Sequence, residues 1–194
     1  ITTLFVTHDQ LEALTLSDQI AVMRDGEIVQ LGSPREIYST PVSRFTAEFI
    51  GTTNLLEGTL ISNSKGIAKV KTPQGEIRCT EVPGLNENDR VSIAIRPANI
   101  VVKSRKNAQD NGIKGKIETM VFLGDSLDCR VEAEGELIRA FVHPNQGLNR
   151  GDEVWLVAEP SDCKLLPYEA KFIEETSGSA AASTITQAPP ASAG

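Results

Sequence analysis

The chain has 194 residues, enough for one domain of ordinary size or two small ones. Hydrophobic residues make up 40% of it and aromatic residues only 5%, so we expect a core built mainly from Val, Ile, Leu and Ala. The net charge of -7 argues against a nucleic-acid partner, because binding to phosphates relies on clustered Lys and Arg.

The cysteines and the lengths of the apolar runs indicate in which cellular compartment the chain lies. Cys79, Cys129 and Cys163 are far apart and odd in number, so they form neither a CxxC pair nor a closed disulfide framework. We expect three reduced thiols, as is usual in a cytosolic protein. No apolar run approaches the roughly 20 residues that span a bilayer. Membrane association would therefore have to come through a protein partner.

Residues 1–7 form a continuous β-branched and apolar run, which predicts a strand buried on both faces of a parallel sheet. Such a strand needs neighbours, so we expect that further sequence precedes Ile1. Asp9 is placed to cap a short helix, with Glu12 in the capping-box position.

The remainder of residues 1–51 completes an α/β segment. Residues 20–23 and 28–31 are predicted to form a hairpin, because an Asp-Gly pair lies between them. Ser33 begins a helix that Thr40-Pro41 interrupts. A second helix is expected over about residues 43–50, and Gly51 ends it.

Residues 52–168 change character, since short β-type segments alternate with Gly, Asn, Asp and Pro turns. This pattern predicts a mainly β domain, and we prefer an OB-like barrel without a solenoid-type repeat. Residues 169–194 are predicted to be a linker and a disordered tail, because their Ala, Ser, Thr and Pro cannot bury enough surface to fold. The predicted strands are 55–61, 67–72, 90–96, 113–122, 126–133, 136–142 and 153–158.

The strongest candidate for chemistry is His8, in the segment Val-Thr-His-Asp-Gln. It follows the predicted strand and precedes the predicted helix. In open α/β sheets, ligands bind beyond the carboxyl ends of the strands. An imidazole at such a point can donate a hydrogen bond to a phosphate oxygen. Taken alone, a histidine after a strand is more often structural or solvent-facing.

The surrounding sequence strengthens the case for His8. Residues 4–51 contain Val-Thr-His-Asp-Gln-Leu-Glu-Ala-Leu, Leu-Ser-Asp-Gln-Ile-Ala-Val-Met, Asp-Gly-Glu-Ile-Val-Gln-Leu-Gly-Ser-Pro-Arg-Glu-Ile-Tyr and Arg-Phe-Thr-Ala-Glu-Phe-Ile-Gly. This segment resembles the end of the nucleotide-binding domain of ABC importer ATPases of the polyamine, iron and sugar type. The resemblance implies that His8 is the switch histidine, which contacts the γ-phosphate of ATP.

The resemblance continues into the β-rich part, which looks like the TOBE regulatory domain of that family. Ala98 departs from the family pattern, which has an acidic residue after Ile-Arg-Pro. The matching segments are Asn54–Gly58, Ile95–Pro97, Phe122–Ser126, Gly151–Leu156 and Leu165–Pro167.

Three family motifs are missing from this sequence. It has no G-x-x-x-x-G-K-[ST] phosphate loop (Walker A), no Leu-Ser-Gly-Gly-Gln signature and no apolar strand ending in Asp-Glu (Walker B). We therefore expect the chain to be inactive as an ATPase alone and to bind ATP and Mg only within a longer protein.

The resemblance also implies partners and a location. They are ABC permease subunits, a second copy of the ATPase in a homodimer, and a cytoplasmic position on the inner face of the membrane. The alternative is a stand-alone OB-like module that binds a small ligand or a partner protein.

Four other residues attract attention and are given a structural role. Arg96 is expected to be solvated or locally paired, and Trp155 to lie in the barrel core. His143 has no metal-binding neighbours in the sequence. Ser126 lacks the G-x-S-x-G elbow and the base that a nucleophile needs.

Overall fold

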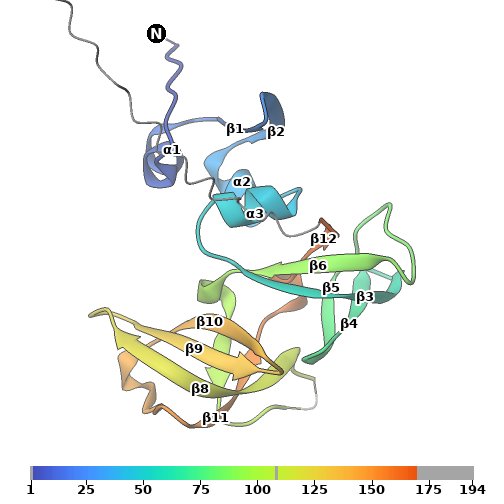
Figure 1. The fold of residues 1–194 in the computed structure, drawn as a ribbon, viewed down its shortest axis with the longest axis vertical. Coiled ribbons are helices and arrows are strands. Elements are labelled where there is room, and N and C mark those ends of the chain that lie inside the picture. The colour runs from blue at the N-terminus through green and yellow to red at the C-terminus, as the bar shows by residue number, and fades with distance from the viewer. Residues whose placement is uncertain (1, 108, 170–194) are drawn as a thin grey trace, which may run out of the picture.

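The computed structural model describes residues 2–107 and 109–169. Figure 1 shows a small N-terminal unit of helices and one hairpin above two β-sheets that contain most of the chain. Within the described ranges, no helix has the length and apolar character needed to cross a membrane. The linker and disordered tail predicted for residues 169–194 lie, apart from Glu169, outside the described residues.

The strand predicted for residues 1–7 is wrong, since residues 2–7 have no regular structure. Leu4 is 92% exposed and Val6 is 89% exposed. A strand is stabilised by hydrogen bonds to its neighbours. In the described part of the chain, no other strand pairs with this segment. Its apolar side chains consequently point into solvent.

The helix and the hairpin that follow agree with the prediction. Helix α1 spans Gln10–Leu16, and the Asp9 carboxylate caps it by accepting from two backbone N–H groups. Strands β1 (Ile20–Arg24) and β2 (Glu27–Gly32) form an antiparallel pair. Both turn residues, Asp25 and Gly26, have a positive φ, at 52° and 83°, as the twist of a tight hairpin requires.

Two short helices complete the N-terminal unit. Helix α2 (Pro34–Ser39) begins with a capping box between Ser33 and Glu36, and helix α3 (Arg44–Phe49) is capped by Ser43. Gly51 follows α3 with a φ of 75°, a conformation that glycine adopts without strain. A small separate core joins the hairpin to the helices, and it consists of Ile20, Val22, Ile37 and Ile50.

The remaining elements form two antiparallel five-stranded sheets, in the orders β12-β6-β3-β4-β5 and β10-β9-β8-β11-β7. This is the mainly β, OB-like fold that the sequence predicts. The strands are β3 (Asn54–Ser64), β4 (Ile67–Thr72), β5 (Gly75–Thr80), β6 (Arg90–Ile95), β7 (Val101–Lys103), β8 (Gly112–Phe122), β9 (Leu127–Ala133), β10 (Glu136–Val142), β11 (Glu153–Val157) and β12 (Lys164–Pro167).

The two sheets arise from two halves of the chain that repeat one element order. Each half begins with an 11-residue strand, continues through three shorter strands, and ends with a proline-initiated 3-10 turn and a short strand. The second half has a further 3-10 turn, η2 (Pro144–Gln146), between β10 and β11. Gly58 and Gly115 occupy equivalent places. A Cβ atom on either would lie 2.5 Å from a carbonyl oxygen of the adjacent strand. The halves share few residue identities, so the repeat is visible only in the structure.

The halves exchange their last strands. Strand β7 of the first half pairs with β11 of the second, and β12 of the second pairs with β6 of the first. Two asparagines add equivalent bridges: the Asn54 amide bonds to both backbone groups of Arg139, and the Asn111 amide to both of Arg78, all four at 2.8 Å. One aliphatic core runs between the sheets, so the two halves stabilise each other.

Trp155 does not lie in this core. Side chains alternate across a strand. Its neighbours Val154 and Leu156 point inward, 1% and 3% exposed, and the indole therefore lies on the outer face. The Lys106 ammonium lies over the indole at 4.9 Å.

Candidate functional site

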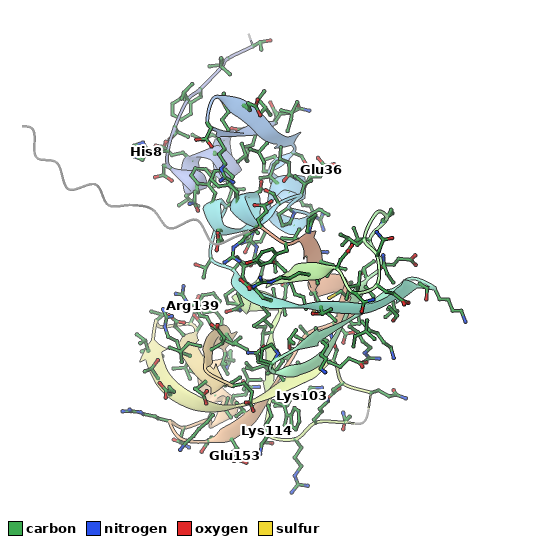
Figure 2. All side chains as sticks on the ribbon, turned by 45° about the vertical axis from the view of Figure 1, so that its right-hand side comes forward. His8, Glu36, Lys103, Lys114, Arg139 and Glu153 are labelled. Atoms are coloured by element: carbon green, nitrogen blue, oxygen red, sulfur yellow. The ribbon has the colours of Figure 1, made fainter. Side chains whose placement is uncertain are left out.

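His8 lies at a bend immediately before α1, and its side chain is exposed. Figure 2 shows the imidazole at the edge of the N-terminal unit, directed away from the ribbon. Among the described residues, none forms a hydrogen bond with this imidazole. Both ring nitrogens are therefore available to a ligand.

The backbone around His8 is held by a local network of hydrogen bonds. Asp9 accepts from the N–H groups of Leu11 at 2.8 Å and Glu12 at 3.2 Å. The Asp9 N–H donates to the Thr7 hydroxyl at 2.9 Å, and that hydroxyl donates to the Glu12 carboxylate at 2.8 Å. The capping box is therefore indirect, since Glu12 bonds to Thr7 instead of to the Asp9 backbone. This network holds the backbone on both sides of His8.

Gln10, two residues after His8, connects the segment to the end of α3. Its side-chain Oε1 accepts a hydrogen bond from the Gly51 N–H at 2.8 Å. The two residues are 41 positions apart in the sequence. The start of α1 is thus tied to the point where the N-terminal unit passes into the β-sheets.

Arg96, directly after β6, also forms a hydrogen bond with Gly51. Its Nη1 donates to the carbonyl oxygens of Ala47 at 3.0 Å and of Gly51 and Thr52, both at 3.2 Å. Its Nη2 donates to the carbonyl of Tyr38 at 3.1 Å, and the guanidinium lies 4.3 Å from the Tyr38 ring centroid. One side chain therefore joins the ends of α2 and α3 to the first sheet.

The expectation that Arg96 is solvated or locally paired is wrong, because the residue is only 7% exposed. Its partners are carbonyl groups and an aromatic ring, and burial lowers the pKa of the guanidinium from its ordinary value. Carbonyls at the ends of helices carry partial negative charge, which stabilises a cation there. A sequence signal exists in retrospect, since Arg96 directly follows the apolar run of β6.

The other candidates have structural roles. The His143 Nδ1 accepts from the Asn145 N–H at 3.2 Å and so caps a 3-10 turn. The Ser126 hydroxyl donates to the neighbouring Asp125 carboxylate at 3.1 Å. Within residues 2–107 and 109–169, no group of three or more His, Cys, Asp or Glu side chains is arranged to hold a metal ion.

An exposed imidazole can donate one hydrogen bond to an anionic ligand. A single hydrogen bond contributes about 0.5–1.5 kcal/mol net to binding. One such contact is too weak to retain a ligand by itself.

Comparison with known proteins finds sequence relatives for most of the chain. The family described as the TOBE domain matches residues 93–166. A spermidine/putrescine import ATP-binding protein of Clostridium acetobutylicum is 35% identical over 175 residues, covering 90% of this chain and 47% of the relative. Its counterpart in Roseobacter denitrificans is 38% identical, covering 86% of this chain and 47% of the relative. The chain thus spans about half the length of the curated relatives it matches.

A structural comparison concerns the fold alone. The cytoplasmic molybdate-binding protein ModG, in a crystal form with molybdate bound, superposes with a TM-score of 0.52 at 14% sequence identity. The match covers 58% of this chain and 94% of ModG. It supports the OB-like character of the β-domain.

Proposed function

Because the chain is the C-terminal part of an ABC-importer ATP-binding subunit and carries its TOBE domain, we propose that it couples the nucleotide state of such an importer to a regulatory β-domain. In the complete protein, hydrolysis of ATP would drive solute uptake. The names of the relatives make a polyamine the first solute to test.

His8 would contact the γ-phosphate of ATP, with Mg and the remaining phosphate ligands supplied by other parts of the complete protein. Bound nucleotide supplies the phosphoryl-transfer chemistry. The imidazole would donate a hydrogen bond to a phosphate oxygen from the end of a segment fixed by Thr7, Asp9 and Glu12. The exposed and unbonded imidazole is the observation that carries this proposal.

The link from His8 to the sheets would pass through Gln10, Gly51 and Arg96. Gly51 accepts from Arg96 through its carbonyl and donates to Gln10 through its N–H. A shift of α1 on phosphate binding would therefore move the point that Arg96 holds. This gives the β-domain a physical route by which to respond to the nucleotide.

The proposal extends to partners and location. We expect the complete protein to form a homodimer that docks on ABC permease subunits at the inner, cytoplasmic face of the membrane. The exposed apolar side chains of the N-terminal unit, including Leu11, Leu16 and Ile28, are available for contacts with other parts of such an assembly.

The test uses the full-length protein that contains this segment. We expect His8→Ala to lower ATP turnover about 100-fold, as does loss of one donor that stabilises transition-state charge. Because His8 forms no hydrogen bond within the described part of this chain, thermal stability should not change. His143→Ala is the matched control and should leave turnover intact. Turnover within threefold of the wild-type value in His8→Ala would refute the proposed role.

A further inference from the structure

An unpaired strand edge lies in each half of the β-domain. Strand β3 pairs with β6 over residues 54–59 but with β4 only from Thr59 onward. Residues 54–58 therefore have one edge without a strand partner in the described structure. The edge strand β10 lies opposite, connected through the Asn54 amide. A cleft of about 310 Å³ remains between residues 52–56 and 136–139, with Arg130 in its wall.

Backbone groups from both sides point into this cleft. The N–H and C=O groups of consecutive strand residues alternate between the two edges. Leu60 bonds to Asp89 on the β6 side, so Leu55 turns its N–H and C=O toward the cleft. The backbone of Arg139 faces Asn54, so Leu137, two residues earlier, presents its own N–H and C=O in the same direction.

Asn54 shows what kind of group fits between these edges. Its carboxamide accepts from the Arg139 N–H and donates to the Arg139 carbonyl, both at 2.8 Å, and also donates to the carbonyl of Ile95 at 3.2 Å. A single amide therefore bridges β3 and β10. A ligand that continues along the cleft needs the same alternation of donors and acceptors, which an extended peptide backbone has.

The repeat shows which charge in the cleft is uncompensated. Lys69 and Arg130 are equivalent, since each lies directly opposite an arginine on the next strand. Lys69 pairs with Glu76 at 3.5 Å. The place of Glu76 is taken in the second half by Leu137, which is 51% exposed. Arg130 consequently has no carboxylate partner in the described part of the chain.

The other charged residues that line the cleft are Arg139 and Glu136. The Arg139 guanidinium donates two hydrogen bonds to the Asp128 carboxylate, at 2.8 and 2.9 Å, and one to the Thr52 hydroxyl at 3.2 Å. Figure 2 shows Arg139 at the side of the β-domain that lies toward the N-terminal unit. Glu136, at the start of β10, is exposed. Within the described residues, the cleft thus has an unpaired cation, Arg130, directly opposite Arg139, and a carboxylate three residues before Arg139 on β10.

We propose that this cleft binds an extended peptide segment of a partner protein as a strand between β3 and β10, with an acidic side chain of the peptide at Arg130. The peptide backbone bonds to Leu55 on one side and to Leu137 on the other. Thr52 lies in the cleft wall, and its carbonyl accepts a hydrogen bond from Arg96. A peptide bound in the cleft would therefore lie beside the junction with the N-terminal unit. This binding site does not depend on the proposed ATPase role.

The test is a titration of the ¹⁵N-labelled 194-residue chain with the acetylated and amidated pentapeptide Thr-Val-Asp-Val-Thr, followed by NMR. We expect chemical-shift changes at the Leu55 and Leu137 amides. Arg130→Gln should weaken binding about tenfold, because a charge-assisted hydrogen bond is lost. Lys69→Gln, the equivalent change in the other half, should alter binding less than twofold.

Two further probes separate a strand from a simple anion. A pentapeptide with the Asp and flanking Val amides methylated should bind at least tenfold more weakly, since it cannot donate to the strand edges. Sodium acetate should not compete at 10 mM. The proposal is overturned if the amides of Leu55 and Leu137 do not shift, if both variants weaken binding equally, if the methylated peptide binds as well, or if acetate alone reproduces the shifts.

Discussion

Replacement of Arg96 by alanine is the sharpest test of how the N-terminal unit is joined to the β-domain. The variant removes a guanidinium that donates four hydrogen bonds to carbonyl groups and contacts the ring of Tyr38. It leaves the aliphatic cores untouched, because Arg96 belongs to none of the three buried clusters. The expected effect is therefore on the junction.

The size of the effect follows from the environment of Arg96. Each hydrogen bond from a charged donor contributes about 1.5–3 kcal/mol. The desolvation of a side chain that is 7% exposed offsets much of that sum. Removing one partner of a buried charged network typically costs about 3–5 kcal/mol. We expect the lower end, about 3 kcal/mol, because water can reach the vacated carbonyls. That corresponds to a fall in Tm of about 6–12 °C for a chain of this size.

Urea unfolding followed by circular dichroism measures the free energy, and hydrogen exchange locates the change. Protection should fall in α2 and α3 and remain in the core strands. The matched control is Arg90→Ala, since the Arg90 side chain is 61% exposed and its ion pair with Glu57 contributes less than about 1 kcal/mol. A loss below 1 kcal/mol in Arg96→Ala, with unchanged exchange in the two helices, would refute this account of the junction.

Three other changes test separate features of the fold. Asn111→Ala, which removes one of the two asparagine bridges between the halves, should lower the free energy of unfolding by about 2–3 kcal/mol in urea titrations, and an unchanged midpoint would contradict the importance of this bridge. Gly58→Ala should cost about 1–3 kcal/mol, because its Cβ would lie 2.5 Å from a backbone carbonyl, whereas Gly32→Ala, which meets the flexible side chain of Glu36 at 3.2 Å, should cost less in the same assay. Hydrogen bonds from Ser33 lower the pKa of Glu36 from its ordinary value of 4.5, so the carboxylate stabilises the folded state above pH 4.5 and loses this effect as the pH falls through the lowered value. The Tm of the wild type should therefore exceed that of Glu36→Gln at pH 7, and the difference should shrink at pH 3; a constant difference would refute the linkage.

Local signals in the sequence predict the local structure well. The Asp-Gly pair, the Ser-Pro-x-Glu start of α2 and the glycine after α3 each act within a few residues, and the structure confirms all three. The strand predicted for residues 67–72 coincides with β4. These features depend on backbone conformation and short-range hydrogen bonds, which neighbouring residues decide.

Features that depend on distant partners could not be predicted in the same way. The burial of Arg96 requires carbonyl groups that lie 44 to 58 positions away in the sequence. Strand β7 has three residues, too few for an alternating pattern to be recognised, and it exists because β11 pairs with it. Residues 2–7 show the converse, since strong β propensity yields no strand without a pairing partner.

Because the halves exchange their last strands, a movement of the junction at Gly51 can affect both halves of the β-domain. Arg96 directly follows β6, and β6 lies between β3 and β12. Strand β12 comes from the second half, so a displacement of β6 acts on both halves at once. A movement of α1, transmitted through Gln10, would therefore act on one continuous core that both halves share. The proposed role of His8 and the proposed response of the β-domain would then be mechanically connected through Gly51.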